Sequence, residues 1–202
     1  MKFTFIMLAV LCLFTFSCAN LEQNYPERNF YVIHAERTDK TSDRVTGGIL
    51  EINNFNISPE FTSREFVYRT GENKYVSDFY NQFFKSPASL IRNETYQWMS
   101  DSGMFKSVIS RSVEIDTDYI LDGNVTELYI DLINLGNPRA VLSIQFFITK
   151  ETPTKTVLIF DKKYREEIDT QDRSPENFIK SWNNALELIL TDFEKDMSSL
   201  NL

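Results

Sequence analysis

Cys18 carries the clearest chemical signal in the sequence, because its thiol follows an apolar N-terminal run at the point where a bacterial lipoprotein is acylated. Basic Lys2 opens this run, which extends to Phe14 and is too short to span a bilayer. The small residue Ser17 precedes the cysteine, and a polar stretch follows it. We therefore predict that residues 1–17 are a lipoprotein signal peptide and that Cys18 is the lipid-attachment site, bearing acyl chains such as palmitate.

Two residues before the cysteine depart from the usual lipoprotein pattern. Thr15 stands where leucine is common, and bulky Phe16 is also uncommon there. Ordinary signal-peptide cleavage and an uncleaved anchor therefore stay open as alternatives. Cys12 is the weaker candidate for acylation, since Leu11 before it is not small. If Cys18 is acylated and Cys12 is removed, no cysteine is left to form a disulfide, so the core alone must stabilise the fold.

Catalytic chemistry has few candidate residues in this sequence. His34 is the single histidine, and neither an orienting carboxylate nor a nucleophile is predictable near it, so we interpret it as a solvated residue at the end of a strand. A single histidine also argues against a Ser-His-Asp site and against zinc sites built from several His and Cys. The six glycines form no phosphate-binding loop. We predict no enzymatic activity and no cofactor.

Two acidic groups could supply oxygen ligands to a cation. The first contains Glu114, Asp116, Asp118 and Asp122, and the second contains Glu166, Glu167, Asp169 and Asp172. The first group lacks the glycine-kinked loop of a calcium site. We interpret its residues as the polar positions of an alternating pattern, where a turn leads into a strand. We interpret the second as a solvated loop between a strand and a helix. We therefore predict no metal site.

The charge balance limits the partners that the protein can bind. Only Lys2 of the 21 basic residues lies in the predicted signal peptide, so 29 acidic side chains face 20 basic ones in the rest of the chain. Such an acidic excess argues against nucleic acid, and also against electrostatic docking onto anionic lipid headgroups. The predicted link to the membrane therefore depends on the lipid anchor.

Behind the cysteine, residues 18–29 are predicted to be a polar tether, and residues 30–202 are enough for one domain with its own core. Residues 37–44 contain no apolar residue and are predicted to form an exposed loop. Alternating or β-rich stretches predict strands at residues 30–33, 48–55, 65–69, 74–76, 119–129, 140–149 and 157–168. In the stretch 140–149, the even-numbered residues form the apolar face, which is typical of a half-buried strand with antiparallel neighbours.

Two amphipathic helices are marked at their ends. The first begins after the N-cap Ser86 with Pro87 and ends at Gly103, and the second begins after Ser174 with Pro175. Their predicted buried residues are Ile91, Thr95, Trp98 and Met99 in the first helix and Phe178, Trp182, Ala185, Leu186, Ile189, Phe193 and Met197 in the second. The predicted fold is α+β, a mainly antiparallel sheet with the two helices packed side by side on one face.

Several segments, taken in order, carry a resemblance to a known family. They are residues 49–60, 66–69 and 79–87, the Ser-Gly-x-Phe turn at 102–105 with Val108, and the x-Leu-x-Gly-x-Val strand at 120–125. In their order and spacing they resemble the ABC-type transport auxiliary lipoprotein component family, which includes the paraquat-inducible protein C-like lipoproteins. The resemblance extends over about residues 18–195. One departure is Phe83-Phe84, where members commonly have an arginine-tryptophan pair.

The resemblance implies an accessory role in lipid transport across the bacterial envelope. Such lipoproteins accompany an ABC permease, its ATPase and a mammalian-cell-entry (MCE) domain protein that bridges the periplasm. Ala19 after the cysteine favours the outer membrane, with the domain facing the periplasm. The alternatives are an envelope-assembly or peptidoglycan-regulating lipoprotein and a direct lipid carrier with an apolar cavity of roughly several hundred Å³. The sequence leaves homo-oligomer formation open.

Overall fold

The long strand β6 (Tyr119–Asp131) is the centre of the sheet in a computed structural model that describes residues 27–38, 48–111 and 115–200. The other elements are β1 (Asn29–Tyr31), β2 (Ile49–Ile57), the short 3-10 helix η1 (Pro59–Phe61), β3 (Glu65–Gly71), β4 (Lys74–Phe83), α2 (Pro87–Ser102), β5 (Ser107–Ser110), β7 (Arg139–Glu151), β8 (Thr156–Asp169) and α3 (Pro175–Ser199). Strands, one helix, three long strands and a last helix follow one another in the predicted order.

The eight strands form one sheet with two arms. On one side of β6, the strands β7 and β8 continue an antiparallel meander. On its other side, β2 pairs with the first half of β6 and β3 with its end, both in parallel. β5 extends the β2 arm, whereas β4 and then β1 extend the β3 arm. The sheet is mainly antiparallel, as predicted, although the alternation of side chains gave no sign of the parallel pairs.

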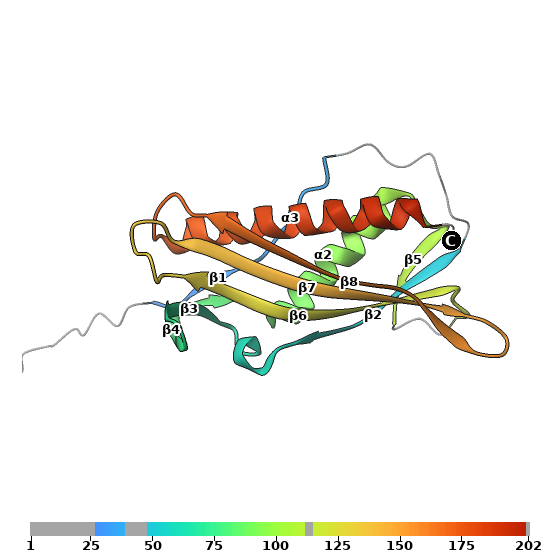
Figure 1. Cartoon of the computed structure of the whole chain (residues 1–202), viewed down its shortest axis with the longest axis horizontal. Coiled ribbons are helices and arrows are strands. Elements are labelled where there is room, and N and C mark those ends of the chain that lie inside the picture. The colour runs from blue at the N-terminus through green and yellow to red at the C-terminus, as the bar shows by residue number, and fades with distance from the viewer. Residues whose placement is uncertain (1–26, 39–47, 112–114, 201–202) are drawn as a thin grey trace, which may run out of the picture.

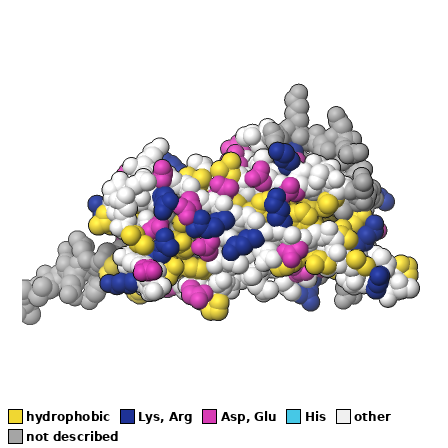
Figure 2. Space-filling view, in the orientation of Figure 1, with side chains coloured by type: hydrophobic (Ala, Val, Ile, Leu, Met, Phe, Trp, Pro, Cys, Tyr) yellow, Lys and Arg dark blue, Asp and Glu magenta, His cyan; other side chains and the backbone are white. Residues whose placement is uncertain are grey.

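Both helices lie on the same face of the sheet, which confirms the predicted fold class (Figure 1). α3 packs on β7 and β8, α2 packs on β2 and β5, and the two helices also contact each other. The face seen in Figure 2 mixes basic and acidic side chains over α3 and the strands. Between α3 and β8, Lys162 Nζ forms an ion pair with Asp196 Oδ2 at 2.6 Å.

The predicted ends of α2 are confirmed. The Ser86 hydroxyl accepts a hydrogen bond from the Ser89 amide at 3.3 Å, and Pro87 occupies the first turn, where its missing N–H is not needed. Gly103 ends the helix with φ of 67°, a left-handed conformation that glycine adopts without strain. The predicted stripe of α2 is buried, and Trp98 is only 4 % exposed.

α3 supplies the largest part of the helical side of the core. All seven predicted apolar positions are buried, and Trp182 is fully buried. Its indole N–H donates to the Val141 carbonyl at 3.3 Å, and its ring packs against Phe66 and Phe83 with centroids 5.1 and 5.4 Å away. The tryptophan therefore joins the β7 meander to the β3–β4 arm.

The strand 140–149 is more buried than predicted. Val141 and Ser143, on the face that the alternation left to solvent, are both inaccessible. Val141 pairs in register with Tyr129, whose ring stacks on Phe61 of η1 and meets Tyr75 of β4. A small second layer, which the sequence did not indicate, thus covers part of the face opposite the helices.

The first strand is shorter than predicted, because the chain leaves the sheet after Tyr31 and runs towards the helices (Figure 1). Ile33 is fully buried along this path. Arg37, predicted to lie in an exposed loop, is mostly buried and forms a bidentate ion pair with Glu194 at 2.8 and 2.9 Å. A guanidinium can be buried in this way when a carboxylate satisfies it. Residues 39–44 of the predicted loop lie outside the described residues.

Candidate functional site

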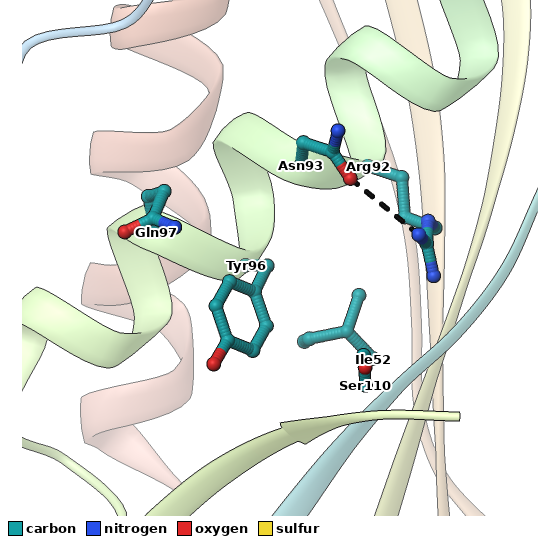
Figure 3. Close-up of a pocket in the computed structure, with 6 residues that line it drawn as sticks. All are labelled: Ile52, Arg92, Asn93, Tyr96, Gln97 and Ser110. Atoms are coloured by element: carbon teal, nitrogen blue, oxygen red, sulfur yellow. Dashed lines mark hydrogen bonds between the residues drawn. The ribbon is translucent and has the colours of Figure 1, made fainter. Parts of the chain in front are cut away.

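A groove runs between α2 and the arm formed by β2 and β5. Its main cavity has a volume of about 380 Å³ and is lined by Ile52, Arg92, Asn93, Tyr96, Gln97 and Ser110. Figure 3 shows the four α2 side chains above the strands, with Ile52 and Ser110 below them. The groove therefore has a mainly polar rim, and its floor combines the fully buried side chain of Ile52 with the hydroxyl of Ser110.

Helical spacing and strand register bring these residues together. Arg92, Asn93, Tyr96 and Gln97 lie at one flank of the buried stripe of α2, because residues three and four apart share a helix face. Beneath the helix, β2 and β5 pair in parallel with Ile52 opposite Ser110. The buried stripe of α2 packs on β2 and β5 and so holds the helix over these strands.

A second hollow of about 220 Å³ continues the groove and shares Arg92 with the first. Its other lining residues are Asn53, Asn54, Phe55, Ala88 and Ser89. Asp122 holds the β2 side of this hollow, because its Oδ1 accepts hydrogen bonds from Asn53 Nδ2 at 2.9 Å and from the Asn54 amide at 3.2 Å. A second guanidinium, that of Arg111, donates to Asn54 Oδ1 at 3.1 Å.

The chemistry of the groove favours binding of oxygen-rich groups. The lining of the two hollows contains a guanidinium, amides, hydroxyls and a phenol, and none of these lining residues is acidic. Arginine and amide N–H groups donate to carbonyl, carboxylate or phosphate oxygens. The lining therefore offers hydrogen-bond donors for recognition of such groups.

His34 lies away from this groove, where the N-terminal segment approaches the helices. Its Nδ1 lies 2.9 Å from Glu94 Oε2, and its ring is largely exposed. The Ala35 amide donates to the same Glu94 oxygen at 2.9 Å, and the His34 amide donates to Asn183 Oδ1 at 2.9 Å. A carboxylate does orient His34, which the sequence did not reveal, but its main effect is to fasten the segment to α2 and α3.

The fold places the acidic candidates apart from one another, and several of those described below have a structural contact. Asp118 accepts from the Ile49 amide at 2.8 Å, and Asp122 supports the groove as described. Glu166, Glu167 and Asp169 were predicted to lie in a loop, but β8 continues through all three. Glu167 forms ion pairs with Arg139 and Arg165 on the strand surface. The strand predicted at 157–168 already overlapped the first two of these residues, and the structure extends it to Asp169, which pairs with Arg139 of β7.

The remaining acidic candidates and the lipid site are placed as follows. Asp116 lies in the segment before β6, where it lines a separate hollow at the surface. Asp172 belongs to the loop before α3, where its Oδ1 accepts from the Ser174 amide at 2.8 Å. Cys18 and Glu114 lie outside the described residues. Within the residues that the structure describes, no group of three or more His, Cys, Asp or Glu is arranged to hold a metal ion. In the same part of the chain, no helix has the length and apolarity needed to cross a membrane.

The groove residues were missed because their sequence signal is weak. Polar residues on the exposed flank of an amphipathic helix are common, and nothing local distinguishes a groove from a solvated face. The contribution of β5 was also unexpected, since Val108 was noted but no strand was predicted at residues 107–110. Only the pairing of β5 with β2 provides the second wall.

Comparisons with known proteins identify the fold. No family model matches the sequence, and no curated protein matches it significantly. The structure is similar to that of a Xanthomonas campestris protein of the DUF330 family, with a TM-score of 0.71 and 12% identity over 82% of this chain and 92% of that chain. An uncharacterized protein gives a TM-score of 0.64 and 13% identity over 85% and 99% of the two chains. A hypothetical protein from Chlamydia trachomatis gives 0.54 and 8% over 77% and 98%. At these identities the likeness shows a shared fold.

Proposed function

We propose that this protein is a non-enzymatic, lipid-anchored component of the bacterial cell envelope that docks the periplasmic part of an ABC/MCE-type lipid transporter at the outer membrane. In this proposal the lipid on Cys18 holds the chain in the membrane, and the folded domain binds the MCE-domain protein in the periplasm. The permease and its ATPase drive transport, so the domain needs a binding surface but no catalytic residues.

The observation that carries the proposal is the place of the resemblance segments in the fold. Residues 49–60, 66–69 and 120–125 belong mainly to the neighbouring strands β2, β3 and β6, and residues 79–87 lead from β4 into α2. Segments that are distant in the sequence therefore meet in one part of the sheet. The segments therefore belong to one structural unit, as expected if the resemblance reflects a shared fold. This supports membership in the auxiliary lipoprotein family.

The structure gives a physical reason for glycine at two positions of these segments. Gly103 takes the left-handed conformation that ends α2. Gly123 lies against the ring of Phe55, and a Cβ built at this glycine would stand 2.6 Å from the nearest ring carbon. A larger residue would be strained by the left-handed backbone at position 103, and at position 123 it would push against the Phe55 ring, which lines the second hollow.

We assign the groove under α2 to the transporter partner. Among the described strands, β5 is the outermost in the arm that starts at β2, and a segment of the partner that enters the groove would lie between this arm and α2. The oxygens of that segment would then face Arg92, Asn93 and Gln97. A direct lipid carrier finds less support here, because four of the six residues that line the main cavity are Arg, Asn, Gln or Ser, whereas acyl chains need mainly apolar walls. An envelope-assembly lipoprotein could use the same fold, and the identity of the partner separates the two functions.

Affinity purification from detergent extracts tests the partner. The wild-type protein is expected to recover an MCE-domain protein, and Arg92→Glu is expected to lower that recovery by about tenfold, because it places a negative charge in the groove. Arg173→Glu is the matched control, since Arg173 is exposed in the loop before α3. Recovery of a different envelope complex, with no MCE-domain protein, would contradict the proposal.

Membrane fractionation of Cys18→Ser tests the anchor. We expect the variant to keep its fold and to leave the membrane, because the described core is built from residues between Ile33 and Met197, far along the chain from Cys18. Circular dichroism provides the control for folding. A cleaved, unlipidated variant that still sediments with the outer membrane would show that something other than lipid holds the protein there.

A further inference from the structure

Four large aromatic side chains stand in solvent close to the start of the described chain. Phe30 is 48 % exposed, Phe79 55 %, Tyr80 42 % and Phe84 57 %. Phe30 meets Phe84 edge to face with centroids 6.3 Å apart, and Phe79 meets Tyr80 in the same way at 5.3 Å. We call these four residues the aromatic patch. Single exposed apolar residues are ordinary, but a group of aromatic rings on β1, on β4 and just after β4 points to a binding surface.

An irregular stretch of β4 builds part of the patch. Glu65 pairs with Gln82 and the next residue, Phe66, pairs with Asp78, so residues 79–81 leave the β3–β4 ladder. Asp78 Oδ1 fixes this bulge by accepting from the Tyr80 amide at 2.9 Å and the Asn81 amide at 3.1 Å. A bulge redirects side chains, and this one carries both Phe79 and Tyr80.

Basic side chains surround the patch although the whole chain is acidic. The Arg28 guanidinium lies 4.0 Å from the centroid of the Phe79 ring, and that of Arg64 lies 5.8 Å from the Phe30 ring. Lys85 is also exposed next to Phe84. The acidic neighbours are Glu27, Glu65 and Asp78, and the Asp78 carboxylate is bound to the amides of the bulge. A hydrogen bond from Ser63 and the charges of Arg64 and Arg28 contribute to lowering the pKa of Glu65, so both arginines act on the same small region.

The patch also lies where the tether enters the domain. The described chain begins at Glu27, nine residues after Cys18, and a chain of nine residues can span at most about 30 Å. The turn between β6 and β7 is at the same end of the long axis of the molecule, and it carries the exposed residues Ile133 and Leu135 (Figure 1). The hairpin between β7 and β8 forms the opposite end (Figure 1).

We propose that the aromatic patch rests on the phospholipid bilayer, at the boundary between headgroups and acyl chains. The proposal deepens the proposed function and rests on it for the anchor at Cys18. Aromatic rings favour this boundary, where their apolar part is dry, and arginine or lysine beside them can meet lipid phosphates. The anchored chain then stands with the patch on the membrane and the β7–β8 hairpin away from it.

Tryptophan variants of the whole lipidated protein test this orientation in vesicles of phosphatidylethanolamine and phosphatidylglycerol that contain brominated acyl chains, which quench nearby indoles. Phe84→Trp places a reporter in the patch, and Phe79→Trp is a second reporter on the bulge. Leu158→Trp is the matched control, since Leu158 is 55 % exposed near the opposite end. Trp98 and Trp182 are buried and give a constant background.

We expect the bromolipid to lower the emission of Phe84→Trp and Phe79→Trp by about half and to leave Leu158→Trp unchanged. Protein that floats with the vesicles without quenching at either patch position overturns the proposal and leaves the anchor intact. A stable dimer without vesicles in which Phe84→Trp is already shielded also overturns it, because a second copy then covers the patch. Analytical ultracentrifugation detects that dimer.

A second arm separates the patch from the anchor. It uses residues 18–202 with Cys18→Ser, secreted through an ordinary cleavable signal peptide, at millimolar lipid. Quenching of Phe84→Trp in this unlipidated chain supports the patch even if the native chain proves to carry no lipid. If neither form of the chain shows quenching, the proposal is wrong.

Discussion

Two aromatic regions share the strands β1 and β4, and they have opposite environments. Phe83 is 1 % exposed and packs between Phe66 and Trp182, with centroids 4.8 and 5.4 Å away. Phe84, the next residue, is 57 % exposed and meets only Phe30 among the aromatic contacts of the described chain. The helices cover the face to which Phe83 points, whereas no described element covers Phe84.

The difference shows that aromatic content alone does not measure the size of a core. The buried region is stabilised by contacts that form when the chain folds, so its aromatic residues should dominate stability. The exposed region gains little from folding, so its aromatic residues should matter for what the protein binds. Substitutions in the two regions should therefore separate stability from membrane contact.

Trp182→Ala should give the largest loss of stability. The side chain is fully buried at the junction of α3, β7 and the β3–β4 arm, so its removal leaves a cavity and deletes the hydrogen bond to Val141. We expect a loss of about 3–5 kcal/mol in the free energy of unfolding, measured by urea denaturation. Lys180→Ala, on the exposed face of α3, should change it little. An unchanged midpoint for Trp182→Ala would show that the core is organised differently.

Phe83→Ala and Phe84→Ala compare the two regions at adjacent positions. Phe83→Ala should cost about 3–4 kcal/mol because a buried ring is lost, whereas Phe84→Ala should cost less than about 0.5 kcal/mol. Thermal unfolding measures both variants under the same conditions. If Phe84→Ala destabilised the fold as much as Phe83→Ala, the ring of Phe84 would have a packing role, and the distinction between the regions would be lost.

Protonation of Asp78, which lies between the two regions, should lower the stability of the fold in acid. Burial alone raises the pKa of Asp78, but hydrogen bonds from Asn81 Nδ2 at 2.7 Å, from the Tyr68 hydroxyl at 2.6 Å and from two backbone amides outweigh it and lower the pKa. A lowered pKa means that this stabilisation is present above the usual carboxyl pKa of about 4 and is lost as the pH falls through the lower, folded-state value.

Asp78→Asn should therefore reduce the dependence of stability on acid. Between pH 5 and pH 2.5 we expect the wild type to lose about 1 kcal/mol more unfolding free energy than the variant, since charged hydrogen bonds at a partly exposed site are screened by water. Urea denaturation at several pH values measures this difference. Parallel curves for the two proteins would show that Asp78 does not hold the bulge through its charge.

Much of the fold was predictable because local signals agreed with it. Ser86, Pro87 and Gly103 set the ends of α2, and Ser174 and Pro175 set the start of α3, since capping depends on residues a few positions apart. The long strands were predictable from their alternation. The bulge at 79–81, the strand β5 and the burial of Arg37 were not, because each depends on a partner far along the chain.

The candidate site follows the same division. The sequence by itself determined the lipid-attachment candidate Cys18, the acidic composition, the two amphipathic helices and their buried tryptophans, because these features depend on residue type and short-range spacing. Only the tertiary structure decided that α2 and β5 form a groove around Arg92, and that Phe83 is buried while Phe84 is exposed. The physical reason is that a side chain's surroundings come from strand pairing and helix packing between distant segments, and local patterns do not encode which segments meet.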